Sequence, residues 1–193
     1  RPPASLSMFQ RLAIPEVFLF TPKRFGDERG FFVETFTRSV MEPMTGPRDW
    51  VQDNQSRSGP EGVLRGLHFQ LAPFAQDKLV RCLRGAILDV AVDIRHGSPT
   101  FGQHVSAKLT EAGGEQIFVP KGFPHGFLTL EENCEIAYKV TNYYSAQHDR
   151  GLMWNDPALG IPWGVTADEI TLSGKDAKLP LLADTPVHFR HGE

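Results

Sequence analysis

His68 and Lys78 are the two residues of this chain whose types and spacing best fit a chemical reaction. His68 lies in residues 65–70 (RGLHFQ), and Lys78 begins the next apolar segment. An unperturbed histidine titrates near pH 6.5, so it can accept a proton under neutral conditions, whereas lysine supplies a cation. A base and a cation in one pocket suit removal of a proton beside a ketone, because the cation stabilises the oxyanion that forms. The two residues therefore predict a proton-transfer site.

Short β strands are expected to position these side chains. Within residues 88–95, Leu88, Val90, Val92 and Ile94 alternate with Asp89, Ala91, Asp93 and Arg95, which predicts a half-buried strand. Further strands are expected over residues 78–83, 102–109, 116–119 and 135–140, and short helical turns over residues 39–41, 156–159 and 173–177. Many short strands separated by Gly- and Pro-containing turns predict an all-β sandwich or barrel.

Residues 114–125 (GEQIFVPKGFPH) narrow this prediction to one type of barrel. They match the second conserved cupin pattern, G-x5-P-x-G-x2-H-x3-N, except that Thr129 replaces the asparagine. The Pro-Gly turn is expected to direct His125 inward. The predicted fold is therefore a cupin, a double-stranded β-helix or jelly-roll barrel, with short peripheral helices.

The first cupin pattern, which normally supplies metal ligands, is broken. It reads G-x5-H-x-H-x3,4-E-x6-G, but here Gln70 replaces the second histidine and Lys78 falls where the glutamate should be, seven residues before Gly85. A protonated lysine cannot coordinate a cation and repels it. His68 and His125 alone fall short of the three or four protein ligands of a usual zinc or iron site. We expect no metal and no other cofactor.

Inversion of a carbon also needs an acid on its second face. Tyr138 alternates with inward-facing apolar residues of its strand and is the candidate, although a packed strand aromatic explains it equally well from the residues alone. Trp154 and Trp163 suit either the core or stacking on a nucleotide.

Composition predicts an ordinary globular protein. The 193 residues are 40% hydrophobic and 22% charged, with a net charge of −3, which favours neither nucleic acid nor a membrane as partner. One domain is expected over residues 1–193, with residues 1–7 a cloning remnant or disordered lead-in rather than a secretion signal. Cys82 and Cys134 lack metal-site or disulfide spacing, so buried, reduced thiols in a cytoplasmic protein are expected.

Several ordered motifs resemble the dTDP-4-dehydrorhamnose 3,5-epimerase family, the cupin-fold nucleotide-sugar epimerases. The resemblance extends over residues 8–184. Its motifs are residues 25–36 (FGDERGFFVETF), 51–58 (VQDNQSRS), 63–70 (VLRGLHFQ), 78–102 (KLVRCLRGAILDVAVDIRHGSPTFG), 117–127 (IFVPKGFPHGF), 138–144 (YKVTNYY), 154–163 (WNDPALGIPW) and 172–182 (LSGKDAKLPLL).

The resemblance implies a reaction and its catalytic residues. The substrate would be dTDP-4-dehydro-6-deoxyglucose, inverted at C3 and C5 on either side of the C4 ketone, for dTDP-L-rhamnose synthesis. His68 would be the base and Asp176 the carboxylate that orients it. Lys78 would stabilise the enolate, and Tyr138 would donate the proton.

The resemblance also implies substrate-binding residues and a partner. Those expected within the subunit are Gln52, Asn54, Arg65, His125, Asp149 and Lys175, with Asp149 standing where the family commonly has glutamate. Arg29 and Glu34 would come from an N-terminal strand that completes the neighbouring site, which implies a homodimer.

Three alternatives remain open at this point. The nearest is a mono-epimerase acting at C3 or C5 only, or a 3,4-ketoisomerase of an antibiotic deoxysugar pathway. The others are a metal-dependent cupin oxygenase and a non-catalytic sugar-binding cupin.

Overall fold

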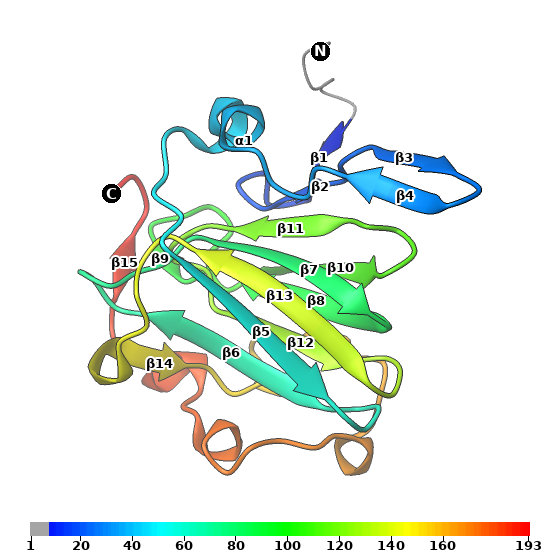
Figure 1. The fold of residues 1–193 in the computed structure, drawn as a ribbon. Coiled ribbons are helices and arrows are strands. Elements are labelled where there is room, and N and C mark those ends of the chain that lie inside the picture. The colour runs from blue at the N-terminus through cyan, green and yellow to red at the C-terminus, as the bar shows by residue number, and fades with distance from the viewer. Residues whose placement is uncertain (1–7) are drawn as a thin grey trace.

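The computed structural model describes residues 8–193 as two facing antiparallel sheets of a cupin-type jelly-roll barrel (Figure 1). The predicted lead-in, residues 1–7, lies outside the described residues. The six-stranded sheet has the order β1 (Phe9–Arg11), β2 (Phe18–Phe20), β11 (Gln116–Val119), β7 (Lys78–Arg84), β13 (Cys134–Val140) and β5 (Gln52–Ser58). The five-stranded sheet has the order β10 (His104–Thr110), β8 (Ala86–Val92), β12 (His125–Thr129), β6 (Leu64–Gln70) and β14 (Asp149–Gly151).

Smaller elements surround the barrel. A hairpin of β3 (Arg24–Asp27) and β4 (Gly30–Val33) projects from it, and β9 (Arg95–His96) pairs in parallel with β15 (Phe189–Arg190) near the C-terminus (Figure 1). The helices are α1 (Arg38–Thr45), η2 (Ala146–His148), η3 (Ala167–Glu169), η4 (Asp176–Lys178) and η5 (Leu182–Asp184). Short helical turns were expected over residues 39–41, 156–159 and 173–177; α1 contains the first, and η4 overlaps the last. Residues 156–159 form a single turn outside any helix, in which the Asp156 carbonyl accepts from the Leu159 amide at 3.0 Å and from the Gly160 amide at 3.3 Å. Among residues 8–193, no helix has both the length and the apolarity needed to cross a membrane.

Among residues 8–193 the apolar core lies in three layers, one inside the barrel and one on the outer face of each sheet. The two layers that contain β8 correct the expectation for residues 88–95. Ile87 and Ala91 face the barrel interior, whereas Val90 and Val92 pack outward against the C-terminal segment. Because that segment covers the second face, β8 is buried on both sides, and Asp89 is 0% exposed. The prediction of a half-buried strand is therefore wrong: alternation identifies two faces but not whether both are covered.

Two tryptophans and the two cysteines are buried in these layers. Trp154 and Trp163 both belong to the layer outside the five-stranded sheet, where Trp163 Nε1 donates a hydrogen bond to the Trp154 carbonyl at 2.9 Å. They are core residues in this structure. Cys82 and Cys134 are buried free cysteines, as predicted.

The contact between β6 and β12 brings two histidines together. Gly66 adopts a φ of +126°, and a Cβ there would lie 2.7 Å from Gly126 Cα, so only glycine permits this close approach. The register then pairs His68 with His125 across the two strands. Both histidines lie beside one cavity of the barrel.

Candidate active site

A cavity of about 250 Å³ lies between the sheets and collects residues that are far apart in the sequence. Its walls come from β5, β6, β7, β12 and β13, and from the segment that leads into η4. The lining residues are Ser56, Arg65, His68, Lys78, His125, Phe127, Tyr138, Ser173, Lys175 and Asp176. Seven residues predicted from the sequence are therefore together: His68, Asp176, Lys78, Tyr138, Arg65, His125 and Lys175.

His68 and Asp176 form a hydrogen-bonded pair at one wall. His68 Nε2 lies 2.6 Å from Asp176 Oδ1, while Asp176 Oδ2 accepts a hydrogen bond from the Gly66 amide at 3.0 Å. Burial alone would raise the pKa of Asp176, but the hydrogen bonds from His68 and Gly66 outweigh it and lower the pKa. An ionised carboxylate that accepts from Nε2–H leaves Nδ1 as the basic nitrogen of His68. The pair can therefore take up a proton and stabilise the imidazolium that results.

A second pair consists of His125, which lines the cavity, and Asp89, which is not among the lining residues. His125 Nε2 is 2.7 Å from Asp89 Oδ2. Asp89 Oδ1 has no hydrogen-bond partner among residues 8–193. Burial raises the pKa of Asp89 despite the opposing effects of His125 and Lys78. Sequence reasoning missed Asp89, although one acidic residue within the apolar run 86–92 (AILDVAV) was a usable signal.

Lys78 supplies a buried cation at the same cavity. Burial lowers its pKa to about 8, while the negative charges of Asp149 and Asp89 act in the opposite direction. Because an ammonium with few water contacts is stabilised by any nearby anion, Lys78 is suited to hold a developing oxyanion. The lysine at the position of the glutamate ligand therefore places a positive charge, rather than a metal ligand, in the cavity.

Tyr138 presents a phenol to the cavity from β13. Burial raises its pKa, and a hydrogen bond with Asn54 and the charge of Arg65 only partly offset this effect. The phenol is therefore protonated near neutral pH and can donate a proton. Asn54 lies behind Tyr138 and accepts a hydrogen bond from Gln52 Nε2 at 2.9 Å.

Two cations border the cavity. Arg65 is held by Ser58, which accepts from Nε at 3.2 Å, and by the Arg57 carbonyl, which accepts from Nη2 at 3.1 Å. Lys175 forms an ion pair with Asp149, which raises the Lys175 pKa. A guanidinium and an ammonium lining one cavity suit an anionic group such as a diphosphate.

The structure does not bring every predicted residue to the cavity lining. Asn54 and Asp149 each contact a lining residue, Tyr138 and Lys175, and Gln52 contacts Asn54, whereas Arg29 and Glu34 are absent from the cavity walls. Arg29 instead pairs with Asp27 at the tip of the β3–β4 hairpin. Within residues 8–193, no group of three or more His, Cys, Asp and Glu side chains is arranged to hold a metal ion.

The barrel and its cavity together define a cupin-type protein whose cavity contains a His–Asp pair, a buried lysine and a buried tyrosine. Comparison with known proteins identifies the family. The family model described as dTDP-4-dehydrorhamnose 3,5-epimerase matches residues 11–184. This chain belongs to the dTDP-4-dehydrorhamnose 3,5-epimerase family.

Individual relatives cover nearly the whole chain. The dTDP-4-dehydrorhamnose 3,5-epimerase of Sinorhizobium fredii is 53% identical over 183 residues, which is 95% of this chain and 93% of the relative. The Legionella pneumophila dTDP-6-deoxy-D-glucose-3,5-epimerase, solved in complex with dTDP-4-keto-L-rhamnose, superimposes with a TM-score of 0.91 at 42% identity, covering 96% of this chain and 98% of that one. The Mycobacterium tuberculosis RmlC epimerase gives a TM-score of 0.90 at 36% identity, covering 95% and 94%.

Proposed function

We propose that this protein is an isomerase that epimerises dTDP-4-dehydro-6-deoxyglucose at C3 and C5, yielding dTDP-4-dehydro-L-rhamnose for dTDP-L-rhamnose biosynthesis. The observation that carries the proposal is one cavity with a His68–Asp176 pair, Lys78 and Tyr138 in a member of this family. The relative solved with dTDP-4-keto-L-rhamnose supports the same substrate class.

His68, Lys78 and Tyr138 divide the proton transfer among them. Nδ1 of His68 removes the proton from the carbon beside the C4 ketone, and the electron pair moves onto the C4 oxygen. Lys78 stabilises this oxyanion, and Tyr138 donates a proton to the opposite face of the same carbon. His68 then carries an extra proton and Tyr138 lacks one, so both exchange with solvent before the second carbon is inverted. The reaction needs neither metal nor redox cofactor.

Arg65, His125 and Lys175 hold the nucleotide-sugar in this scheme. Arg65 and Lys175 border the cavity as cations, which fits the negative charge of a diphosphate. Gln52, Asn54 and Asp149 assist through Tyr138 and Lys175. A cytoplasmic location is part of the proposal, and the free, buried state of Cys82 and Cys134 supports a reducing compartment.

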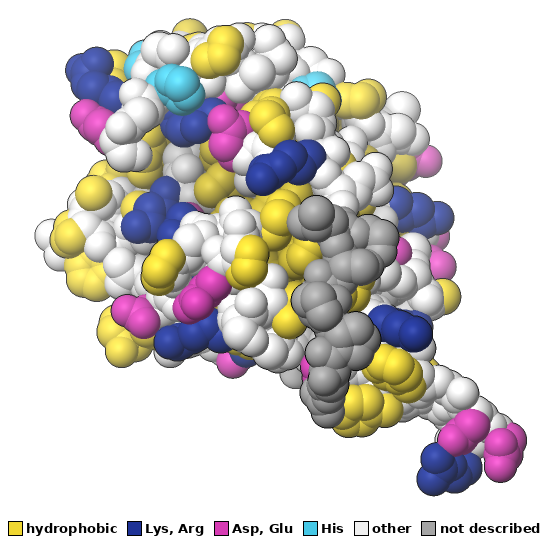
Figure 2. Space-filling view, turned by 90° about the horizontal axis from the view of Figure 1, so that it is seen from above, with side chains coloured by type: hydrophobic (Ala, Val, Ile, Leu, Met, Phe, Trp, Pro, Cys, Tyr) yellow, Lys and Arg dark blue, Asp and Glu magenta, His cyan; other side chains and the backbone are white. Residues whose placement is uncertain are grey.

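A homodimer would complete the site. The β3–β4 hairpin stands away from the body as an arm with charged side chains at its tip (Figure 2). Phe25, Phe31 and Phe32 on this arm are 57%, 62% and 64% exposed, which is unusual for three neighbouring aromatic residues unless a partner covers them. In the proposed dimer the arm delivers Arg29 and Glu34 to the neighbouring cavity.

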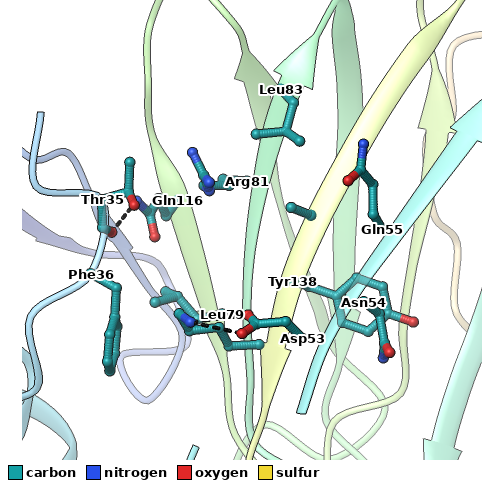
Figure 3. Close-up of a pocket in the computed structure, with 12 residues that line it drawn as sticks. Thr35, Phe36, Asp53, Asn54, Gln55, Leu79, Arg81, Leu83, Gln116 and Tyr138 are labelled. Atoms are coloured by element: carbon teal, nitrogen blue, oxygen red, sulfur yellow. Dashed lines mark hydrogen bonds and ion pairs between the residues drawn. The ribbon is translucent and has the colours of Figure 1, made fainter. Parts of the chain in front are cut away.

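A groove on the outer face of the six-stranded sheet also supports a partner. Its volume is about 400 Å³, and Thr35 and Phe36 of the arm's base form one side (Figure 3). Arg81 and Leu83 of β7 line the groove on the face opposite the barrel interior. A second copy of the chain would cover Arg81 and Leu83 in this groove.

Proton exchange tests the reaction directly. The purified protein is incubated with dTDP-4-dehydro-6-deoxyglucose in D2O and followed by NMR, with His68→Asn as the control. Deuterium at both C3 and C5, with an L-rhamnose product after reductase trapping, is the expected result. Deuterium at one carbon would instead identify a mono-epimerase, a shifted carbonyl a ketoisomerase, and no exchange a different substrate or a binding role.

Complementation tests the arm. Arg29→Ala and His68→Asn are each expected to lower activity, but mixed dimers contain one intact site if Arg29 acts in the partner's cavity. Activity of the mixture well above that of either variant alone supports the shared site. If the mixture is confirmed to contain dimers by mass but is no more active than either variant alone, Arg29 does not act in the partner's cavity.

A further inference from the structure

Gln70 occupies the place of the second cupin histidine, and its amide is fully engaged. The side chain is 4% exposed, its Nε2 donates to the Phe74 carbonyl at 2.8 Å and the Tyr143 carbonyl at 3.1 Å, and its Oε1 accepts from the Ser145 amide at 2.9 Å. A buried amide with three main-chain partners has few alternative orientations. Gln70 therefore ties β6 to two separate loops.

One of these loops, residues 142–146, carries two exposed aromatic side chains. Tyr143 and Tyr144 are each 60% exposed, and the loop has no strand pairing of its own. Besides Gln70, the Gln52 side chain accepts from the Tyr144 amide at 3.1 Å. Side-chain amides of two strands thus replace the ladder hydrogen bonds that would otherwise order this segment.

The tyrosine loop lies at the border of the cavity. Its neighbour Lys175 lines the cavity and interacts electrostatically with Tyr144. The sugar would occupy the region of His68 and Lys78, and a diphosphate would meet Arg65 and Lys175. The next part of a nucleotide-sugar beyond Lys175 is its nucleoside, and exposed tyrosine faces suit a planar base.

We propose that Gln70 is a positioning residue that holds the tyrosine loop, residues 142–146, in the conformation that receives the nucleoside end of the substrate. The inference rests on the proposed function and adds a use for the residue that replaces a metal ligand. A loop ordered before binding loses less conformational freedom when the ligand arrives, so the amide of Gln70 contributes to affinity rather than to the chemical step.

Gln70→Met tests this role because methionine has a similar length and none of the three hydrogen bonds. We expect the Kd for dTDP, measured by calorimetry, and the KM for the dTDP-sugar to rise together by about tenfold, while kcat stays within about threefold. Gln70→Glu retains an acceptor for the Ser145 amide but sets a carboxylate against two carbonyls, so it is expected to impair binding at least as much.

Thr129→Val is the matched control. Thr129 is 1% exposed and its hydroxyl also bonds the main chain, accepting from the Val63 amide at 3.0 Å and donating to the Pro60 carbonyl at 3.1 Å. Its loss is expected to lower thermal stability without changing the Kd for dTDP. An unchanged Kd and KM in Gln70→Met, or a loss confined to kcat, would overturn the proposal.

Amide exchange in the wild-type protein keeps the test usable if the Gln70 variants do not fold. The Tyr144 and Ser145 amides should exchange slowly without ligand, and more slowly with dTDP. Rapid exchange of both in the free protein would overturn the proposal. Because dTDP binding needs no turnover, a failure to epimerise the sugar would count against the proposed function without deciding the role of Gln70.

Discussion

The two His–carboxylate pairs of the cavity contain the same chemical groups in different surroundings. His68 and His125 face each other in the register of β6 and β12, and their contacts to Asp176 and Asp89 measure 2.6 Å and 2.7 Å. The His68 side chain is 33% exposed, whereas that of His125 is 7% exposed. The pKa of Asp176 is lowered and that of Asp89 is raised, in each case through the balance of burial and hydrogen bonding.

This difference in burial and hydrogen bonding allows two histidine–aspartate pairs in one barrel to have different roles. In the His68–Asp176 pair the carboxylate is ionised and accepts hydrogen bonds at both oxygens, and the partly exposed histidine can exchange a proton with a ligand. The buried pair lies against Lys78, where the charge of Asp89 favours the ammonium form. We expect the first pair to move protons and the second to set the electrostatics of the cavity.

The largest expected effect separates the two histidines. His68→Asn should lower kcat by about 10²–10⁴, because the general base is lost. His125→Asn should act mainly on KM and on stability, because it leaves a buried carboxylate without its partner. Steady-state kinetics and thermal unfolding of both variants test this contrast. If kcat of His68→Asn stays near the wild-type value, His68 is not the general base and the two histidine–aspartate pairs do not differ in the proposed way.

Lys78 lines the cavity together with both histidines, and its charge should appear in the pH profile of the reaction. Lys78→Met should lower kcat by about 10²–10³, as expected for loss of an oxyanion-stabilising group. The lysine is active as the cation, and its pKa is lowered to about 8, so the wild-type rate should be retained below that pH and lost as the pH rises through it. Lys78→Arg, which stays charged, should lack this alkaline decline if it folds and turns over. If the rate of Lys78→Arg still declines at the same alkaline pH, that decline is due to a group other than Lys78.

Tyr138→Phe should separate proton removal from inversion. Because His68 remains as the base, solvent deuterium should still enter the substrate, whereas formation of inverted product should fall by roughly 10²-fold. NMR of the deuterated sugar, before and after reductase trapping, measures the two processes independently. Equal loss of exchange and inversion would mean that Tyr138 does not act on one face alone.

The smallest effects are expected from replacing the two carboxylates, Asp176 and Asp89. Asp176→Asn should lower kcat by about 10–100-fold, because the orientation of His68 depends on it. Asp89→Asn should change kcat less, but it should move the alkaline limb to lower pH, since the charge of Asp89 raises the Lys78 pKa. The pH dependence of kcat, measured for both variants, tests these two predictions. A shift in Asp176→Asn and none in Asp89→Asn would reverse the assignment.

Much of the fold could be predicted because its signals are local. Period-two alternation predicted the strands around Lys78 and Tyr138, and the Pro-Gly turn before His125 predicted the barrel. The substitution of Lys78 for a metal ligand also indicated the type of chemistry. Turn residues and side-chain alternation act over a few positions, so they can be read directly from the chain.

The partner carboxylates depended on contacts between distant segments. Asp176 lies 108 positions from His68, and it was assigned only through the family resemblance. Asp89 was expected on the exposed face of a half-buried strand, yet packing of the C-terminal segment on one side and the barrel on the other buries it completely. Alternation along a strand cannot show what covers each face.

The sequence by itself determined the strand pattern, the loss of the cupin metal ligands and the presence of a base, a cation and a phenol. Only the tertiary structure decided which histidine is the more exposed, which carboxylate each one meets and how burial and hydrogen bonding change the pKa values of those carboxylates. The physical reason is that residue type sets the chemical group, whereas solvent exclusion and hydrogen bonding by distant segments set its protonation state.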